Sequence, residues 1–194
     1  MEKGSKVIKI DHKENGIFVG AAWGRKKTRW GRKGARLALE VIADYFRKRD
    51  SECIKETYLD EMKCDLLRLI RKRLYQQALK DERKIKEYEC CFEGVFIWPQ
   101  KNSFICFNFG DGAVLGKTKK GHVGSLILSE KRIRREIELT MDGAVSAVGL
   151  KRGILSDYHE LYVLEGCQER WAMFITEKKI EEGENPLLMS IKSC

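Results

Sequence analysis

The sequence has very little proline, no long apolar run and no paired cysteine motif. Only Pro99 and Pro186 occur among its 194 residues, which excludes collagen-like and proline-rich low-complexity proteins. No stretch of 18 consecutive apolar residues is present, so we expect no membrane-spanning helix and no membrane partner. The first residues are polar and lack the apolar segment of a signal peptide, and we therefore expect a cytoplasmic protein.

The cysteines do not form a pattern of known chemistry. There are seven, an odd number, and no C-x-x-C pair is matched by a second one. This excludes an obvious disulfide framework and the usual zinc-binding motifs. We expect reduced thiols that pack in the core.

Positive charge is what the sequence has in excess. Lys and Arg number 38 against 29 Asp and Glu, which gives a formal net charge of +9. A basic protein favours anionic partners such as phosphopeptides, acidic proteins or nucleic acid, and the net charge does not choose among them. The length fits a single domain over residues 1–194.

The hydrophobic pattern predicts strands at both ends of the chain and helices between them. A hairpin is predicted from strands at 6–10 and 16–22, joined by the turn-forming pair Asn15-Gly16. Apolar residues at helical spacing predict helices over 34–49 and 57–88. Short runs rich in β-branched and aromatic residues predict further strands at 91–98, 103–109, 113–116, 124–128, 160–165 and 171–176. This order predicts an α+β fold in which antiparallel sheets carry the core and helices cover an outer face.

Four segments, in the same order, resemble the protein phosphatase 2C family of metal-dependent serine/threonine phosphatases. They are Phe18-Val-Gly-Ala-Ala-Trp-Gly24 with the helix from Gly34, the strand opening Cys90-Cys91-Phe92, the turn in Phe107-Asn-Phe-Gly-Asp-Gly112, and Trp171-Ala-Met-Phe-Ile-Thr-Glu-Lys178. The resemblance implies two packed antiparallel sheets with α-helices on both sides, an αββα sandwich. It also implies a PPM-type phosphatase domain in which aspartates hold two Mg²⁺ or Mn²⁺ ions.

The metal ligands implied by this resemblance are largely absent from the sequence. Ala21 stands at the position of the bridging aspartate and Ala22 at that of the following glycine, while Glu177 and Lys178 stand at the later Asp-Gly pair. Hard divalent ions need several oxygen ligands, and a methyl group supplies none. The Gly-Asp turn is the one motif retained, as Asp111. We therefore expect a pseudophosphatase with its metal site lost, no catalytic residue and no cofactor, acting as a binding or regulatory module.

Two alternatives remain open from the sequence. An active, divergent phosphatase would use Asp111, Glu177 and further carboxylates to hold Mg²⁺ or Mn²⁺. A basic nucleic-acid-binding domain would use the positive charge and the tryptophans near it.

The most unusual segment lies between the first hairpin and the first helix. Residues 25–36 contain seven cations and no acid, interrupted by Trp30 and glycines. These candidate anion-binding residues are Arg25, Lys26, Lys27, Arg29, Arg32, Lys33 and Arg36. The segment can be read as a solvated loop or as an anion-binding patch, because Arg forks suit phosphate and carboxylate groups. The second interpretation predicts an acidic or phosphorylated protein as partner.

Overall fold

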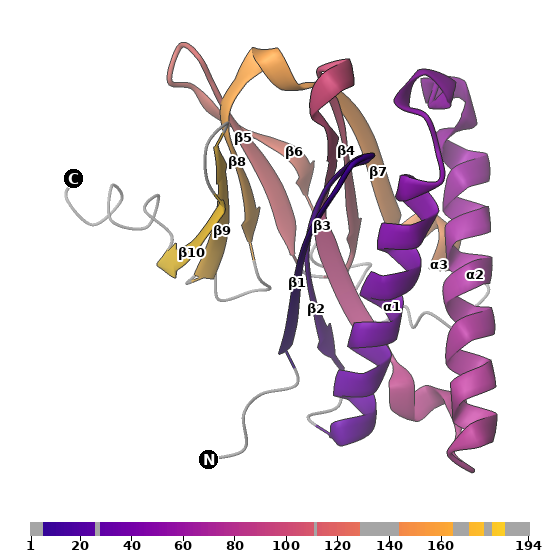
Figure 1. Ribbon diagram of the computed structural model, residues 1–194. Helices are drawn as coiled ribbons and strands as arrows, with labels where there is room; N and C mark the ends of the chain where they lie inside the picture. Colours follow the sequence, from indigo (N-terminus) through magenta and orange to yellow (C-terminus); the bar gives the residue numbers. More distant parts are fainter. Residues whose placement is uncertain are drawn as a thin grey trace.

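The computed structural model describes residues 6–25, 28–110, 112–128, 144–164, 171–176 and 180–184. They form an α+β structure of two antiparallel five-stranded sheets with helices (Figure 1). The predicted fold class is confirmed in these terms.

The first sheet contains the predicted N-terminal hairpin at one edge. Its strands are β1 (Lys6–Lys13), β2 (Gly16–Gly24), β3 (Cys90–Trp98), β4 (Ser103–Phe109) and β7 (Val148–Ile154), in that order. Every neighbouring pair is antiparallel.

The second sheet is built from the C-terminal half of the described chain. Its strands are β5 (Ala113–Thr118), β6 (Val123–Leu128), β8 (Tyr158–Leu164), β9 (Trp171–Thr176) and β10 (Ile180–Glu184). Their order across the sheet is β10-β9-β8-β5-β6, again antiparallel throughout.

The helices cover the outer face of the first sheet. Helix α1 (Arg29–Arg47) packs across β2 and β3, and α2 (Leu59–Lys80) lies beside α1 and contacts β7 and the short α3 (Ala144–Ala147) (Figure 1). Among the described residues, no helix covers the outer face of the second sheet. Short 3₁₀ segments lie at Ser51–Cys53, Glu56–Tyr58, Ile85–Tyr88, Pro99–Lys101 and Leu155–Asp157.

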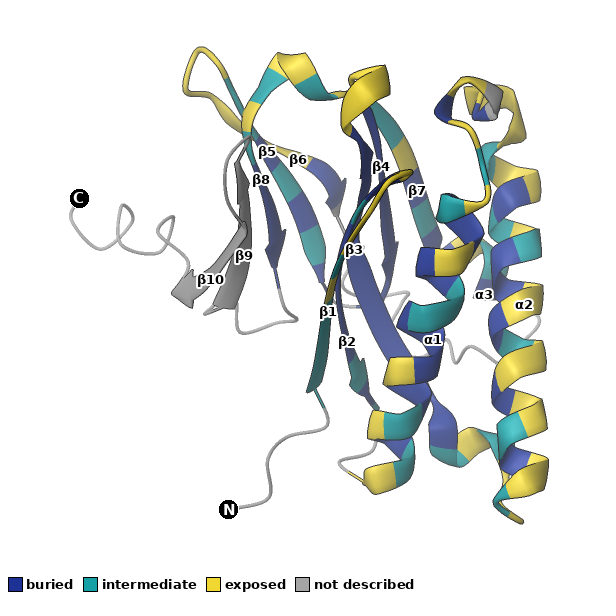
Figure 2. Cartoon of the chain, viewed as in Figure 1, coloured by how far each residue is buried: buried dark blue, intermediate teal, exposed yellow. Residues whose placement is uncertain are grey.

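The three layers enclose two apolar cores. Between helices and sheet, Phe107 of β4 stacks on Phe18 of β2 and on Phe46 of α1, with ring centroids 5.6 and 6.0 Å apart. Between the sheets, Val19 of β2 packs with apolar residues of both sheets. Side chains alternate between the two faces of a strand, so β2 and β3 are buried on both sides (Figure 2).

Several predicted boundaries were wrong, and each has a local cause. Helix α1 begins at Arg29 instead of residue 34, because the Thr28 hydroxyl caps it by accepting a hydrogen bond from the Gly31 amide at 3.1 Å. Helix α2 ends at Lys80 instead of near residue 88, because Glu82 takes a left-handed backbone with φ of 53°. Strand β7 was not predicted, since Gly149 and Gly153 interrupt its apolar alternation.

Other predictions concern single residues or lie outside the described chain. Cys90, Cys91 and Cys106 are buried free thiols as expected, but Cys64 is exposed on α2, which corrects the expectation for that residue. The charge pattern of residues 130–139 also predicts a short helix, and this segment lies outside the described residues. No described helix is both long and apolar enough to cross a membrane.

Candidate functional site

The two alanines lie side by side in β2 but face different cores. Ala21 is 2% exposed and packs between the two sheets, whereas Ala22 is fully buried against the helix layer. In the strand register Ala21 lies opposite Ile8 on one side and Glu93 on the other. The methyl group of Ala21 therefore shares the inner face of the sheet with a carboxylate.

Glu93, a charged residue at the centre of the first sheet, was not among the predicted site residues. It is fully buried in β3, and its register partner on β4 is Asn108. The Asn108 side-chain amide donates a 2.8 Å hydrogen bond to the Gly112 carbonyl. A Cβ atom at Gly112 would lie 1.3 Å from a Glu93 carboxylate oxygen, so this carboxylate lies directly against the turn that follows β4.

A single feature of the sequence could have drawn attention to Glu93. It is the only charged residue in the nine-residue strand Cys90–Trp98, which otherwise holds apolar residues and one glycine. Burying a carboxylate is costly unless other polar groups compensate. An acid in such a strand therefore indicates a specific role for its carboxylate.

The start of α1 forms a basic groove, which we define by its lining. The groove has a volume of about 560 Å³ and is lined by Val7, Arg29, Trp30, Arg32, Lys33, Arg36 and Asp81. Four of the seven cations proposed from the sequence are thus brought together. Arg25 lies at the end of β2, outside this lining, and Lys26 and Lys27 lie outside the described residues.

Three cations at the basic groove lie close to the indole ring of Trp30. The Arg29 guanidinium lies 4.2 Å from the indole centroid, and the corresponding distances are 5.4 Å for Arg83 and 5.6 Å for the Lys33 ammonium. Cations over an indole face are favourable, which helps to hold like charges close together. Arg83 was not predicted, because it is distant from this segment in sequence and arrives from the end of α2.

Asp81 is the one carboxylate among the described residues that line the basic groove. It accepts hydrogen bonds from the Lys33 ammonium at 2.6 Å, from the Gln77 amide at 3.1 Å and from the Tyr88 hydroxyl. The bond from Lys33 and then that from Tyr88 lower the pKa of Asp81 to about 2. Burial and the bond to Asp81 raise the pKa of Tyr88. Lys33 is therefore neutralised internally.

The three arginines that line the basic groove differ from Lys33 in their exposure and ion pairing. Arg29, Arg32 and Arg36 are all exposed. Arg36 lies 3.8 Å from Glu40, and within the described chain Arg29 and Arg32 have no carboxylate within ion-pair distance. The first turn of α1 also contains no acidic residue, although the positive end of the helix dipole lies there. The groove thus has positive charge available to an external anion.

Comparison with known proteins decides the family. The sequence profile of protein phosphatase 2C matches residues 9–172, which is most of the chain. The chain belongs to the protein phosphatase 2C family. None of the curated protein sequences matches it significantly.

Solved structures of other proteins share the fold. The chain is similar to serine/threonine phosphatase Stp1 from Staphylococcus aureus, with a TM-score of 0.58, 13% identity, and coverage of 84% of this chain and 70% of that one. It is also similar to a Stage II Sporulation E family protein from Thermanaerovibrio acidaminovorans, with a TM-score of 0.53, 11% identity, and coverage of 86% and 79%. At such low identity these similarities establish the fold alone.

Ala21 and Ala22 are the described residues at positions that the resemblance relates to a two-metal centre. Ala21 and Ala22 offer methyl groups, and no group of three or more His, Cys, Asp or Glu in the described chain could hold a metal ion. Glu177 and Lys178, which the resemblance relates to this centre, and Asp111, which it relates to a turn beside the centre, lie outside the described residues.

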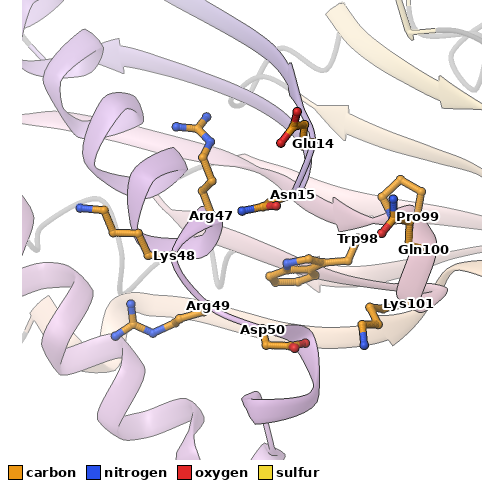
Figure 3. A pocket seen from close by; sticks show the side chains of 10 residues that line it. All are labelled: Glu14, Asn15, Arg47, Lys48, Arg49, Asp50, Trp98, Pro99, Gln100 and Lys101. Carbon is orange, nitrogen blue, oxygen red and sulfur yellow. The ribbon is translucent and has the colours of Figure 1, made fainter.

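A second cavity lies at the opposite end of β2 from the alanines. It has a volume of about 290 Å³, and the nine-tenths buried Trp98 indole lies in the middle of its lining (Figure 3). Its lining is Glu14, Asn15, Arg47, Lys48, Arg49, Asp50, Trp98, Pro99, Gln100 and Lys101. Arg47 is bound to Asp44 at 2.7 Å and to Asp11 at 2.5 Å. The charge of Arg47 is already neutralised, and two acids, Glu14 and Asp50, line this cavity. The cavity therefore suits an anion less well than the basic groove does.

Proposed function

We propose that this protein phosphatase 2C family member is catalytically silent and binds an acidic or phosphorylated protein through the basic groove. The buried methyl group of Ala21 carries the first half of the proposal. It occupies the position where the family resemblance requires a bridging carboxylate, and it packs among apolar side chains between the sheets. Without that oxygen ligand the bridged pair of ions loses a main contact.

The charge of the basic groove supports the second half. Three exposed arginines surround it, and two of them have no carboxylate close by in the described chain. Planar guanidinium groups bind phosphate and carboxylate through paired hydrogen bonds. The free amides at the start of α1 add partial positive charge. An external anion would relieve the repulsion among these groups.

Binding and turnover can be measured on the same preparation. The full chain is titrated with a fluorescein-labelled acidic peptide, in phosphoserine and unphosphorylated forms, while phosphate release is followed in millimolar Mn²⁺. We expect binding without phosphate release. Arg32→Glu should weaken binding about tenfold, whereas Lys120→Glu, an equal charge change at an exposed turn outside the groove lining, should have little effect. Equal losses in both variants would contradict a groove site.

The alternative of an active, divergent phosphatase is favoured by one observation. The Glu93 carboxylate is buried on the inner face of the first sheet, beside Ala21 and the turn at Gly112. Calorimetric titration with Mn²⁺ separates the two functions. Tight binding and phosphate release, both abolished by the isosteric Glu93→Gln, would establish the enzyme and refute catalytic silence.

A further inference from the structure

The outward face of α2, together with the N-cap residue Tyr58 just before it, carries a stripe of six side chains that none of the sites above uses. These residues follow one another at alternating spacings of three and four: Tyr58, Glu61, Asp65, Arg68, Lys72 and Tyr75. This spacing places the five residues within α2 on one face of the helix, and the N-cap Tyr58, whose backbone is αR, continues the same line. The buried residues of α2, such as Leu66, Ile70 and Leu74, lie on the opposite face of the helix. Figure 2 shows α2 with alternating buried and exposed positions beside α1. The tyrosines at the two ends are 48% and 56% exposed, which is high for aromatic side chains.

The order of side chains in the stripe is self-complementary. Read from Tyr58 it runs aromatic, acid, acid, base, base, aromatic, and its centre lies between Asp65 and Arg68. Two such helices placed antiparallel about a two-fold axis at that centre bring unlike groups together. Tyr58 then lies opposite the Tyr75 of a second copy, and each acid lies opposite a base. A two-fold interface needs this kind of self-complementary patch.

Within one chain the charges of the stripe are only partly satisfied. Arg68 donates to one carboxylate oxygen of Asp65 at 2.9 Å, and the other oxygen lies 4.0 Å from Arg49. Glu61 and Lys72 make no ion pair with any described residue. Arg68 and Lys72 are like charges one helical turn apart, as are Glu61 and Asp65, and such pairs destabilise a helix. An antiparallel second copy would place an opposite charge beside each of these four residues.

We propose that a second copy of this chain docks antiparallel on α2, about a two-fold axis between Asp65 and Arg68. In this arrangement Glu61 of each copy pairs with Lys72 of the other, and the tyrosines pair at both ends. The stripe extends over about 26 Å of helix. A contact between two single helices buries less area than a standard stable interface, so the dimer is weak, with a Kd on the order of 100 µM.

Glu61 and Lys72 give a clean test, because they lie three helical turns apart in one chain and do not interact there. Sedimentation velocity of the full chain from about 10 to 500 µM should show a concentration-dependent dimer. Glu61→Lys places two ammonium groups opposite each other at both symmetric contacts, and Lys72→Glu does the same with two carboxylates. Each single variant should weaken the dimer about tenfold, and the double variant should return to within about threefold of wild type.

The result decides the proposal in either direction. Circular dichroism and thermal melting verify that the surface variants remain folded, and Lys120→Glu controls for the change in net charge. A chain that stays monomeric over the whole range would overturn the proposal. So would a dimer in which the double variant is no stronger than the single ones.

Discussion

Asp81 shows how one carboxylate joins the two helices at the basic groove. It follows directly after α2 and binds Lys33 of α1, while Tyr88 donates to it from the adjoining 3₁₀ segment. Its pKa of about 2 lies below the ordinary value of 3.8, so the folded state favours the ionised form. The stabilisation is therefore complete above about pH 4 and is lost as the pH falls towards 2.

This linkage predicts a pH-dependent effect of Asp81→Asn. Between pH 5 and 7 the variant should melt at a lower temperature than wild type, because Lys33 loses its charged partner. The difference should narrow steadily below pH 4, as the wild-type carboxylate gains a proton. Asp157→Asn is the matched control, since Asp157 is exposed. Thermal melts followed by circular dichroism measure the effect, and a difference that stays constant down to pH 2 would assign it to packing instead of charge.

At the scale of elements, the close approach of α1 to the segment before β3 depends on Gly34. A Cβ atom there would lie 2.0 Å from the Tyr88 carbonyl oxygen, which is a backbone atom with little freedom to move. Gly34→Ala would gain about 1 kcal/mol in helix propensity. The overpacking costs about 1–3 kcal/mol or more and should outweigh that gain.

We therefore expect Gly34→Ala to lower the free energy of unfolding in urea by about 1–2 kcal/mol. Gly124→Ala is the control, because no heavy atom lies within 4 Å of the Cβ position there and its φ is ordinary. That substitution should change the stability by less than about 0.5 kcal/mol. A Gly34→Ala protein more stable than wild type would contradict the contact.

The elements also show what the sequence could and could not predict. The hairpin at Asn15-Gly16 and the amphipathic core of α2 follow from local patterns, and both were predicted. The true start of α1 depends on the single hydroxyl of Thr28, and β7 is held by pairing with β4 more than by its own pattern. The candidate site was harder to predict from the sequence. Asp81 and Arg83 follow α2 and are distant in sequence from the other residues of the basic groove.

At the scale of the whole molecule, the net charge of +9 attracts any polyanion, so binding alone does not establish a site. With nucleic acid, this general attraction is most easily mistaken for binding at a specific site. The affinity of nucleic acid for a basic protein falls linearly on a plot of log K against log salt, with a slope of about −0.9 for each phosphate neutralised on a duplex. A local site for a single anionic side chain has a shallower salt dependence.

Two variants with the same net charge distinguish attraction by the overall charge of the molecule from binding in the basic groove. Arg32→Glu and Lys120→Glu each lower the net charge by two, but only Arg32 lines the groove. For a 20-base-pair duplex followed by fluorescence anisotropy, we expect weak binding, a steep salt dependence and similar losses in both variants, because the overall charge controls that association. The phosphopeptide should discriminate between them about tenfold. If Arg32→Glu instead abolished duplex binding while Lys120→Glu left it intact, the groove would be a nucleic-acid site, and the assignment of a protein partner to it would fail.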